Sequence, residues 1–145
     1  AKKLVGAVAG KAKTVYDFTF AGSVTLNLLK DRDGALALYK SAEGLCSTKQ
    51  DYAGLVALVK QQTGDKAILS ELLSLGRKKL TEFSDQLFLA ETFLVDAQDA
   101  ENAAAVYEDA ELNALSNDAL SQLGTSLSGR LGDAKWASRI LAKIR

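Results

Sequence analysis

The chain has 145 residues with 18 basic and 18 acidic side chains, so a formal net charge of zero gives it no overall attraction to nucleic acid. It contains no histidine, which excludes an imidazole base for a serine or cysteine nucleophile and a histidine ligand for zinc or haem iron. It also contains no proline and is rich in alanine and leucine, which together favour a nearly all-helical fold.

The first sixteen residues, AKKLVGAVAGKAKTVY, stand apart from the rest of the sequence. They contain four lysines and no acidic residue, and we predict that residues 1–16 form a basic helix. We interpret this helix as a cap on the hairpin that follows it. The alternative is peripheral contact with a membrane surface or an acidic partner. The apolar residues that share one face of the predicted helix are Leu4, Val8, Ala12 and Val15.

From residue 17 onward the sequence repeats with a period of 34 residues. Each repeat contains an aspartate followed by small or apolar residues at the spacing of one helical face. Aspartate is a favoured N-cap, so each one predicts a turn and the start of a second helix in a hairpin. These aspartates are Asp31, Asp65, Asp99 and Asp133. The small residues that we expect to be buried where the two helices touch are Ala35, Ala103 and Ala137.

A second series of aspartates marks the first helix of each hairpin. Asp17, Asp51 and Asp85 are 34 residues apart, and Asp118 departs from this spacing by one residue. We predict that these aspartates are the N-caps of the first helices. Short polar links predict that neighbouring helices run antiparallel. The predicted hairpins are 17–29 with 33–45, 51–62 with 65–79, 85–97 with 99–114, and 118–130 with 133–145.

A 34-residue helical hairpin with a small residue early in its second helix resembles the tetratricopeptide repeat. The match covers residues 17–145. The chain lacks that family's proline after the second helix, and Leu73 and Leu141 replace its aromatic residue in two of the hairpins. The family's alanine, aromatic, alanine pattern is present in the other two: Ala35–Tyr39–Ala42 and Ala103–Tyr107–Ala110.

The resemblance implies an all-α fold in which antiparallel helical hairpins stack as a short array. The alternative is a plain helical bundle whose helices have similar lengths. We treat residues 1–145 as a single all-α domain, with the basic helix 1–16 followed by four hairpins in 17–145.

Two short motifs are typical of ligand-binding loops but lack the required spacing. Three residues separate Gly6 from Gly10, where a phosphate loop has four, and alanine stands where that loop has serine or threonine. A calcium loop that began at Asp31 would need glutamate at its twelfth place, which is Ala42. We therefore expect neither a cofactor nor a metal. Because no nucleophile–base pair is visible, we also expect that the protein is not an enzyme.

The sequence favours a non-enzymatic protein–protein interaction module, either an adaptor or a structural subunit of a larger assembly. If the family resemblance holds, the first helices of the hairpins form the partner-binding surface. The lysine and asparagine clamp by which some family members hold carboxylates is not recognisable there. The alternative function is a helical bundle that binds a small apolar ligand, lipid or pigment. The predicted surface comprises Phe20, Val24, Asn27, Leu58, Gln61, Phe88, Thr92, Gln122 and Ser126.

The last predicted helix, residues 133–145, has an apolar stripe that the preceding hairpin can cover only in part. We expect this stripe to dock onto a protein partner, since exposed apolar stripes mark interaction sites. The competing interpretation is that the N-terminal helix folds back over it. The stripe comprises Trp136, Ile140 and Ile144, beside Ala137 and Leu141. The basic residues that would rim it are Lys135, Arg139 and Lys143.

Charge is distributed unevenly along the chain. Residues 82–118 include ten acidic residues and no lysine or arginine, whereas residues 77–79 and the last helix are basic. Such asymmetry suits docking to charged protein partners. No apolar run is long enough to span a bilayer. We expect a soluble protein. The absence of an initial methionine is compatible with simple removal of an initiator methionine before Ala1 and with removal of an organelle-targeting peptide.

Overall fold

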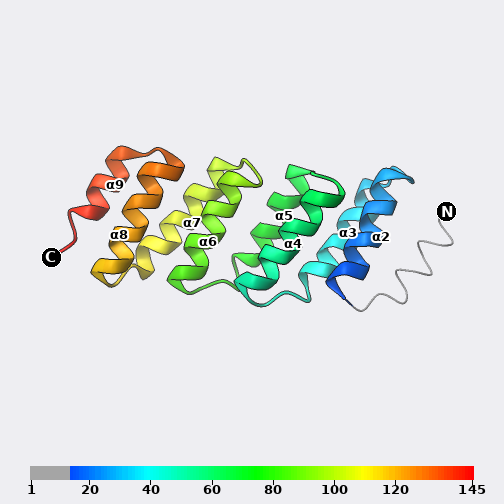
Figure 1. Cartoon of the computed structure of the whole chain (residues 1–145), viewed down its shortest axis with the longest axis horizontal. Helices are drawn as coiled ribbons and strands as arrows, with labels where there is room; N and C mark the ends of the chain where they lie inside the picture. The colour runs from blue at the N-terminus through cyan, green and yellow to red at the C-terminus, as the bar shows by residue number, and fades with distance from the viewer. Residues whose placement is uncertain (1–13) are drawn as a thin grey trace. The chain divides into compact units, whose positions relative to one another are not determined.

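The computed structural model describes residues 14–145, and every regular element within them is helical (Figure 1). This confirms the all-α fold and the predicted turns. The predicted helix 1–16 lies outside the described residues except for its last three. The helices pair in chain order as α2 (Val15–Asn27) with α3 (Arg32–Glu43), α4 (Lys49–Gln62) with α5 (Lys66–Gly76), α6 (Phe83–Val95) with α7 (Ala100–Asn113), and α8 (Asn117–Ser126), extended by the π-helical turn η1 (Leu127–Leu131), with α9 (Ala134–Leu141).

The chain divides into two compact units, and the division falls between Gly76 and Arg77. Each unit contains two hairpins: α2–α3 with α4–α5 in the first unit, and α6–α7 with α8–α9 in the second. Each unit also has its own buried core. The largest buried side chains of the first core include Tyr39, Tyr52, Leu55 and Leu72. Those of the second include Leu89, Phe93, Tyr107 and Leu123.

The turn inside each hairpin has the same construction four times. The residue before each aspartate adopts a positive φ, and the aspartate carboxylate accepts a hydrogen bond from a backbone N–H in the first turn of the second helix, at 2.9–3.1 Å. This confirms that Asp31, Asp65, Asp99 and Asp133 cap the second helices. The positive-φ residues are Lys30 (55°), Gly64 (66°), Gln98 (51°) and Gly132 (78°).

The first helices begin one or two residues earlier than predicted, and their N-caps lie two or three residues before the predicted aspartates. The prediction that Asp17, Asp51, Asp85 and Asp118 are N-caps was wrong, because they lie inside the first turn. In α4, for example, the Thr48 hydroxyl and the Asp51 carboxylate each accept a bond from the other residue's backbone N–H, which is a capping box. The N-caps are Thr14, Thr48, Glu82 and Ser116, again 34 residues apart.

Small residues let the two helices of a hairpin approach closely. Ala35, Ala103 and Ala137 are all buried, as predicted. A Cβ atom at Gly22 would lie 3.0 Å from the Tyr39 ring, so the backbone of α2 lies directly under that side chain. These close contacts fix the spacing of the helices and hence the position of the side chains on the outer surface.

Candidate functional site

The predicted partner surface of the first unit is accessible on α2 and α4. Asn27 and Gln61 are exposed, and Val24 and Leu58 are half-buried. Phe20 is 45% exposed, which is a large fraction for an aromatic side chain on a well-formed helix.

Tyr16 belongs to the same face of α2, and the sequence analysis missed it. Its ring is 58% exposed and stacks on the Phe20 ring, with 6.3 Å between centroids and 17° between planes. The signal was available in the sequence, since residues four apart lie on one helical face. We assigned Tyr16 to the N-terminal segment, although α2 begins at Val15.

In the second unit only part of the predicted partner surface is accessible. Phe88 is half-buried and Gln122 is exposed. Thr92 and Ser126 are only 6% exposed, so their assignment to a partner surface was wrong. The Thr92 hydroxyl donates to the Phe88 carbonyl at 2.7 Å, and the Ser126 hydroxyl lies 2.6 Å from the Tyr107 hydroxyl. Their polar groups are therefore satisfied inside the unit.

The predicted stripe on the last helix is partly covered within the second unit, where α9 packs on α8 and η1 and Trp136 contacts α7. Ile140 is fully buried, so it cannot contact a partner, and that part of the prediction was wrong. Trp136 is half-buried and packs edge-on against the Tyr107 ring, with 6.2 Å between centroids. Ile144 is 39% exposed and the adjoining Leu141 is 42% exposed. The accessible part of the stripe is therefore its C-terminal end.

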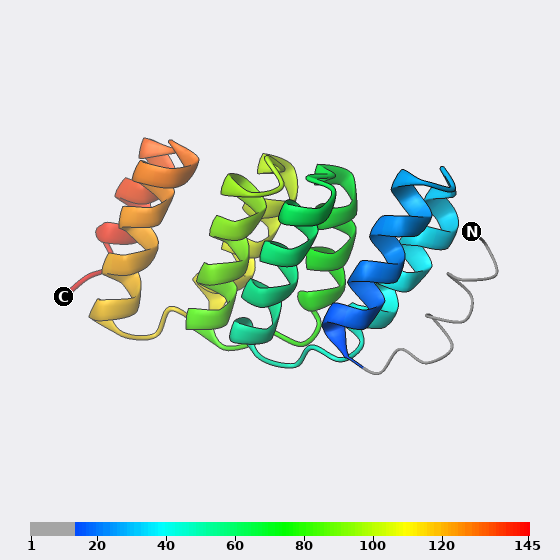
Figure 2. The same ribbon diagram turned by 45° about the vertical axis from the view of Figure 1, so that its right-hand side comes forward.

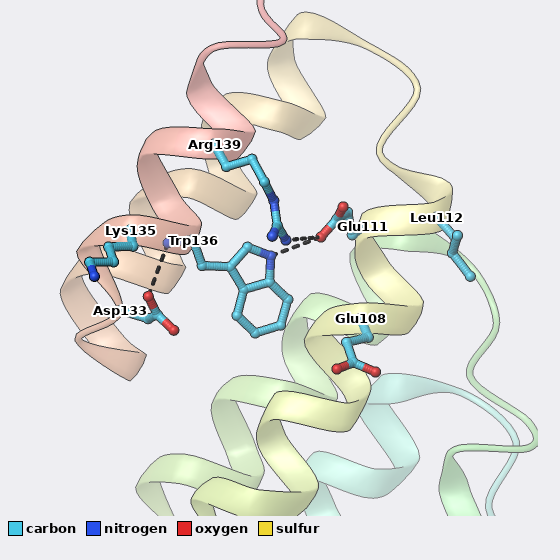
Figure 3. Close-up of a pocket in the computed structure, with 7 residues that line it drawn as sticks. All are labelled: Glu108, Glu111, Leu112, Asp133, Lys135, Trp136 and Arg139. Atoms are coloured by element: carbon cyan, nitrogen blue, oxygen red, sulfur yellow. Dashed lines mark hydrogen bonds and ion pairs between the residues drawn. The ribbon is translucent and has the colours of Figure 1, made fainter.

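Glu111 on α7 holds the last helix through three donors from α9 and the residues that follow it. Figure 3 shows two of them, Trp136 and Arg139. Its carboxylate accepts from Trp136 Nε1 at 2.8 Å, from Arg139 Nη2 at 3.2 Å and from Lys143 Nζ at 3.2 Å. Burial alone would raise the pKa of Glu111, but the hydrogen bonds and the two cations lower it overall. Glu111 therefore pairs with two of the three residues predicted as a free basic rim, and Lys135 is the third.

A hollow of about 900 Å³ opens beside this cluster, between α7 and α9 (Figure 3). The Trp136 indole projects from α9 toward α7 and forms part of its wall, and Arg139 Cζ lies 6.0 Å from the centroid of the indole ring. The hollow is open to solvent and its walls carry both charges, so it suits contact with a polypeptide better than enclosure of an apolar molecule. The lining residues are Glu108, Glu111, Leu112, Asp133, Lys135, Trp136 and Arg139.

Two leucines at the end of α7 are exposed and were not singled out from the sequence. Leu112 lines the hollow and is 78% exposed, and Leu115 in the following turn is 88% exposed. The 34-residue period could have identified these leucines as unusual, because the preceding hairpins have small or polar residues at the equivalent positions. The equivalents of Leu112 are Gly44 and Lys78, and those of Leu115 are Ser47 and Thr81.

A second hollow of about 510 Å³ lies on α6, α8 and η1, and it is polar. An ion pair between Arg130 Nε and Glu91 Oε2, at 3.1 Å, lies at its edge. Gln122, from the predicted partner surface, lines it. Within residues 14–145, no group of three or more cysteine or carboxylate side chains is placed so that it could hold a metal ion.

Comparison of the chain with known proteins gives no match to a family model, to a curated protein or to a solved structure. The resemblance to the tetratricopeptide repeat therefore stays a prediction. Within residues 14–145, no helix combines the length and the apolar character needed to cross a membrane.

Proposed function

We propose that the protein is a non-enzymatic protein–protein interaction module, acting as an adaptor or as a structural subunit of a larger assembly. The observation that carries this proposal is a pair of exposed leucines at the end of α7: Leu112, which lines the Trp136 hollow, and Leu115 in the turn that follows. Full burial of one leucine side chain stabilises a protein by roughly 1.5–3 kcal/mol. Two leucines that stay in water do not contribute this stabilisation to the fold, and burial against a partner would provide it. Exposed apolar side chains gathered beside a hollow are typical of a docking site.

The hollow also contains residue types that dominate protein interfaces. Tryptophan and arginine are enriched among the residues that contribute most to binding. The hydrogen bonds from Trp136 and Arg139 to Glu111 hold both side chains in place before any partner arrives. A pre-ordered surface loses less conformational entropy on binding, which favours affinity.

The charge on this face indicates what the partner presents. Glu101 and Glu108 are exposed on α7, and Glu108 lines the hollow beside Leu112. The helix α7 contains no lysine or arginine, so its outer side is acidic, and Glu111 offsets part of the positive charge of Arg139 and Lys143. A partner segment with an apolar side chain for Leu112 and a flanking lysine or arginine for Glu108 is complementary to it.

A photo-crosslinking amino acid at position 112 tests the proposal in an extract of the native source. We expect one predominant crosslinked protein, identified by mass spectrometry, and loss of that product when Glu108→Lys is added. The matched control places the same crosslinker at Leu28, which is 72% exposed on the other unit. A crosslinking pattern that is the same at both positions would contradict the proposal.

The alternative function, binding of a small apolar ligand, lipid or pigment, receives no support from the described hollows. Those hollows are open, and charged and polar side chains line much of each. Sites for apolar molecules are enclosed.

A further inference from the structure

The first unit has an uncharged face formed by two helices that pack side by side, α2 and α4 (Figure 2). Each helix contributes four residues at helical spacing, and the two sets are related by the 34-residue period. None of the eight side chains is charged. We call this surface the α2–α4 face; its residues are Tyr16, Phe20, Val24 and Asn27 on α2, and Gln50, Gly54, Leu58 and Gln61 on α4.

The α2 side of this face is a ridge. Tyr16 and Phe20 stack on each other and project their rings into solvent. Val24 continues the same stripe and is half-buried. Two stacked aromatic rings form a wider and stiffer projection than either ring alone, and aromatic side chains lose little conformational entropy when they are buried at an interface.

The α4 side of the face is low and flat. Gly54 occupies the position of Phe20 in the next repeat, and a Cβ atom there would meet nothing within 4 Å. Ala53 and Ala57 flank it and are also exposed. A surface of glycine and alanine lets another side chain approach the helix backbone closely.

We propose that the α2–α4 face binds the same face of a second copy of this chain, with Phe20 of each copy seated on Gly54 of the other. The ridge and the flat surface lie next to each other on one face. A two-fold axis between them therefore places the ridge of each copy on the flat surface of the other. Because none of the eight residues of the face is charged, the two-fold operation pairs no like charges among them. The inference concerns the first unit and does not depend on the proposed function of the α7–α9 hollow.

The size of the face sets the expected strength of association. Specific interfaces generally bury above about 1,000 Å² in total. The α2–α4 face has only eight residues per copy, so a dimer formed through it would lie at the lower end of that range. We therefore expect a reversible dimer with a dissociation constant of roughly 1–100 µM.

Sedimentation equilibrium of the full chain, from about 1 to 200 µM, measures the association. We expect the wild-type mass to rise from monomer to dimer across this range. Phe20→Asp and Gly54→Lys should each remain monomeric, and Leu112→Asp, an exposed leucine in the other unit, should dimerise as the wild type does. Circular dichroism confirms that each variant is folded, and Gly54→Lys has free space for its side chain.

Mixing the two monomeric variants makes the test specific for the proposed pairing. A mixed dimer contains one native Phe20–Gly54 contact and one contact where the introduced carboxylate meets the introduced ammonium group. We expect dimers in the equimolar mixture only. A wild type that is monomeric throughout, a dimer that survives both substitutions, or a mixture that stays monomeric would overturn the proposal.

Discussion

Lys30 and Gln98 adopt the left-handed backbone conformation that glycine adopts in the two equivalent turns. A side chain with a Cβ atom pays roughly 1–2 kcal/mol for this conformation, whereas glycine does not. We expect Lys30→Gly and Gln98→Gly each to raise the free energy of unfolding, by about 0.5–1 kcal/mol after the greater chain entropy of glycine is deducted. Urea denaturation measures the change. The control Gly64→Ala should lower the free energy of unfolding, and a lower value for Lys30→Gly would contradict this account of the turns.

The lowered pKa of Glu111 predicts a pH dependence of stability. A carboxyl group whose pKa is lower in the folded state contributes its full stabilisation above the unfolded value, about 4.3, and loses it as pH falls through the folded pKa. Glu111→Gln removes this term. We therefore expect the unfolding free energy to fall less between pH 7 and pH 3 in the variant than in the wild type. Trp136, the single tryptophan, reports the change by fluorescence. Identical pH profiles would show that Glu111 gains nothing from its three donors.

At the scale of helices, the tight contact within a hairpin predicts an intolerance of large residues. Ala103 is fully buried near the start of α7, so Ala103→Phe should overpack the α6–α7 hairpin and destabilise it by about 1–3 kcal/mol. The control Ala37→Phe changes an exposed position on α3 and carries the same loss of helix propensity. Thermal unfolding compares the two variants. An equal effect at both positions would mean that the contact between α6 and α7 is looser than described.

The second helices were predictable because the same residue type marks all four starts, as Asp31 and Asp65 illustrate. The starts of the first helices were not, because their N-caps are chemically different, from Thr14 to Glu82. Aspartate repeats instead inside the first turn, where its charge favours the helix N-terminus although another residue is the N-cap. The period was therefore read correctly while the N-caps were placed two or three residues late.

Burial at the predicted partner surface depended on contacts that a single sequence does not specify. Thr92 and Ser126 have the spacing of accessible residues, yet their hydroxyls are satisfied inside the second unit. Ile140 has the spacing of the exposed stripe, yet the packing of α9 buries it. Phe20, by contrast, is accessible as predicted.

Across the whole molecule, the uneven charge of the sequence is partly neutralised by pairs distant along the chain. Arg77 contacts Asp109 at 2.6 Å, and Arg130 contacts Glu91 at 3.1 Å. Residue counts could not show which acidic residues remain available to a partner. The structure leaves Glu108 exposed beside Leu112, and this combination of charge and apolar surface defines the proposed docking site.

The size of the complex that the protein occupies in an extract of its native source tests the central claim most directly. Density-gradient sedimentation should place the wild type in fractions much larger than its own monomer or dimer. The double variant Leu112→Asp with Leu115→Asp should sediment at the size of the isolated protein, and Leu28→Asp should sediment as the wild type does, because Leu28 lies on the other unit. A wild type found only at the size of the isolated protein, or a double variant that stays in the large complex, would contradict the claim.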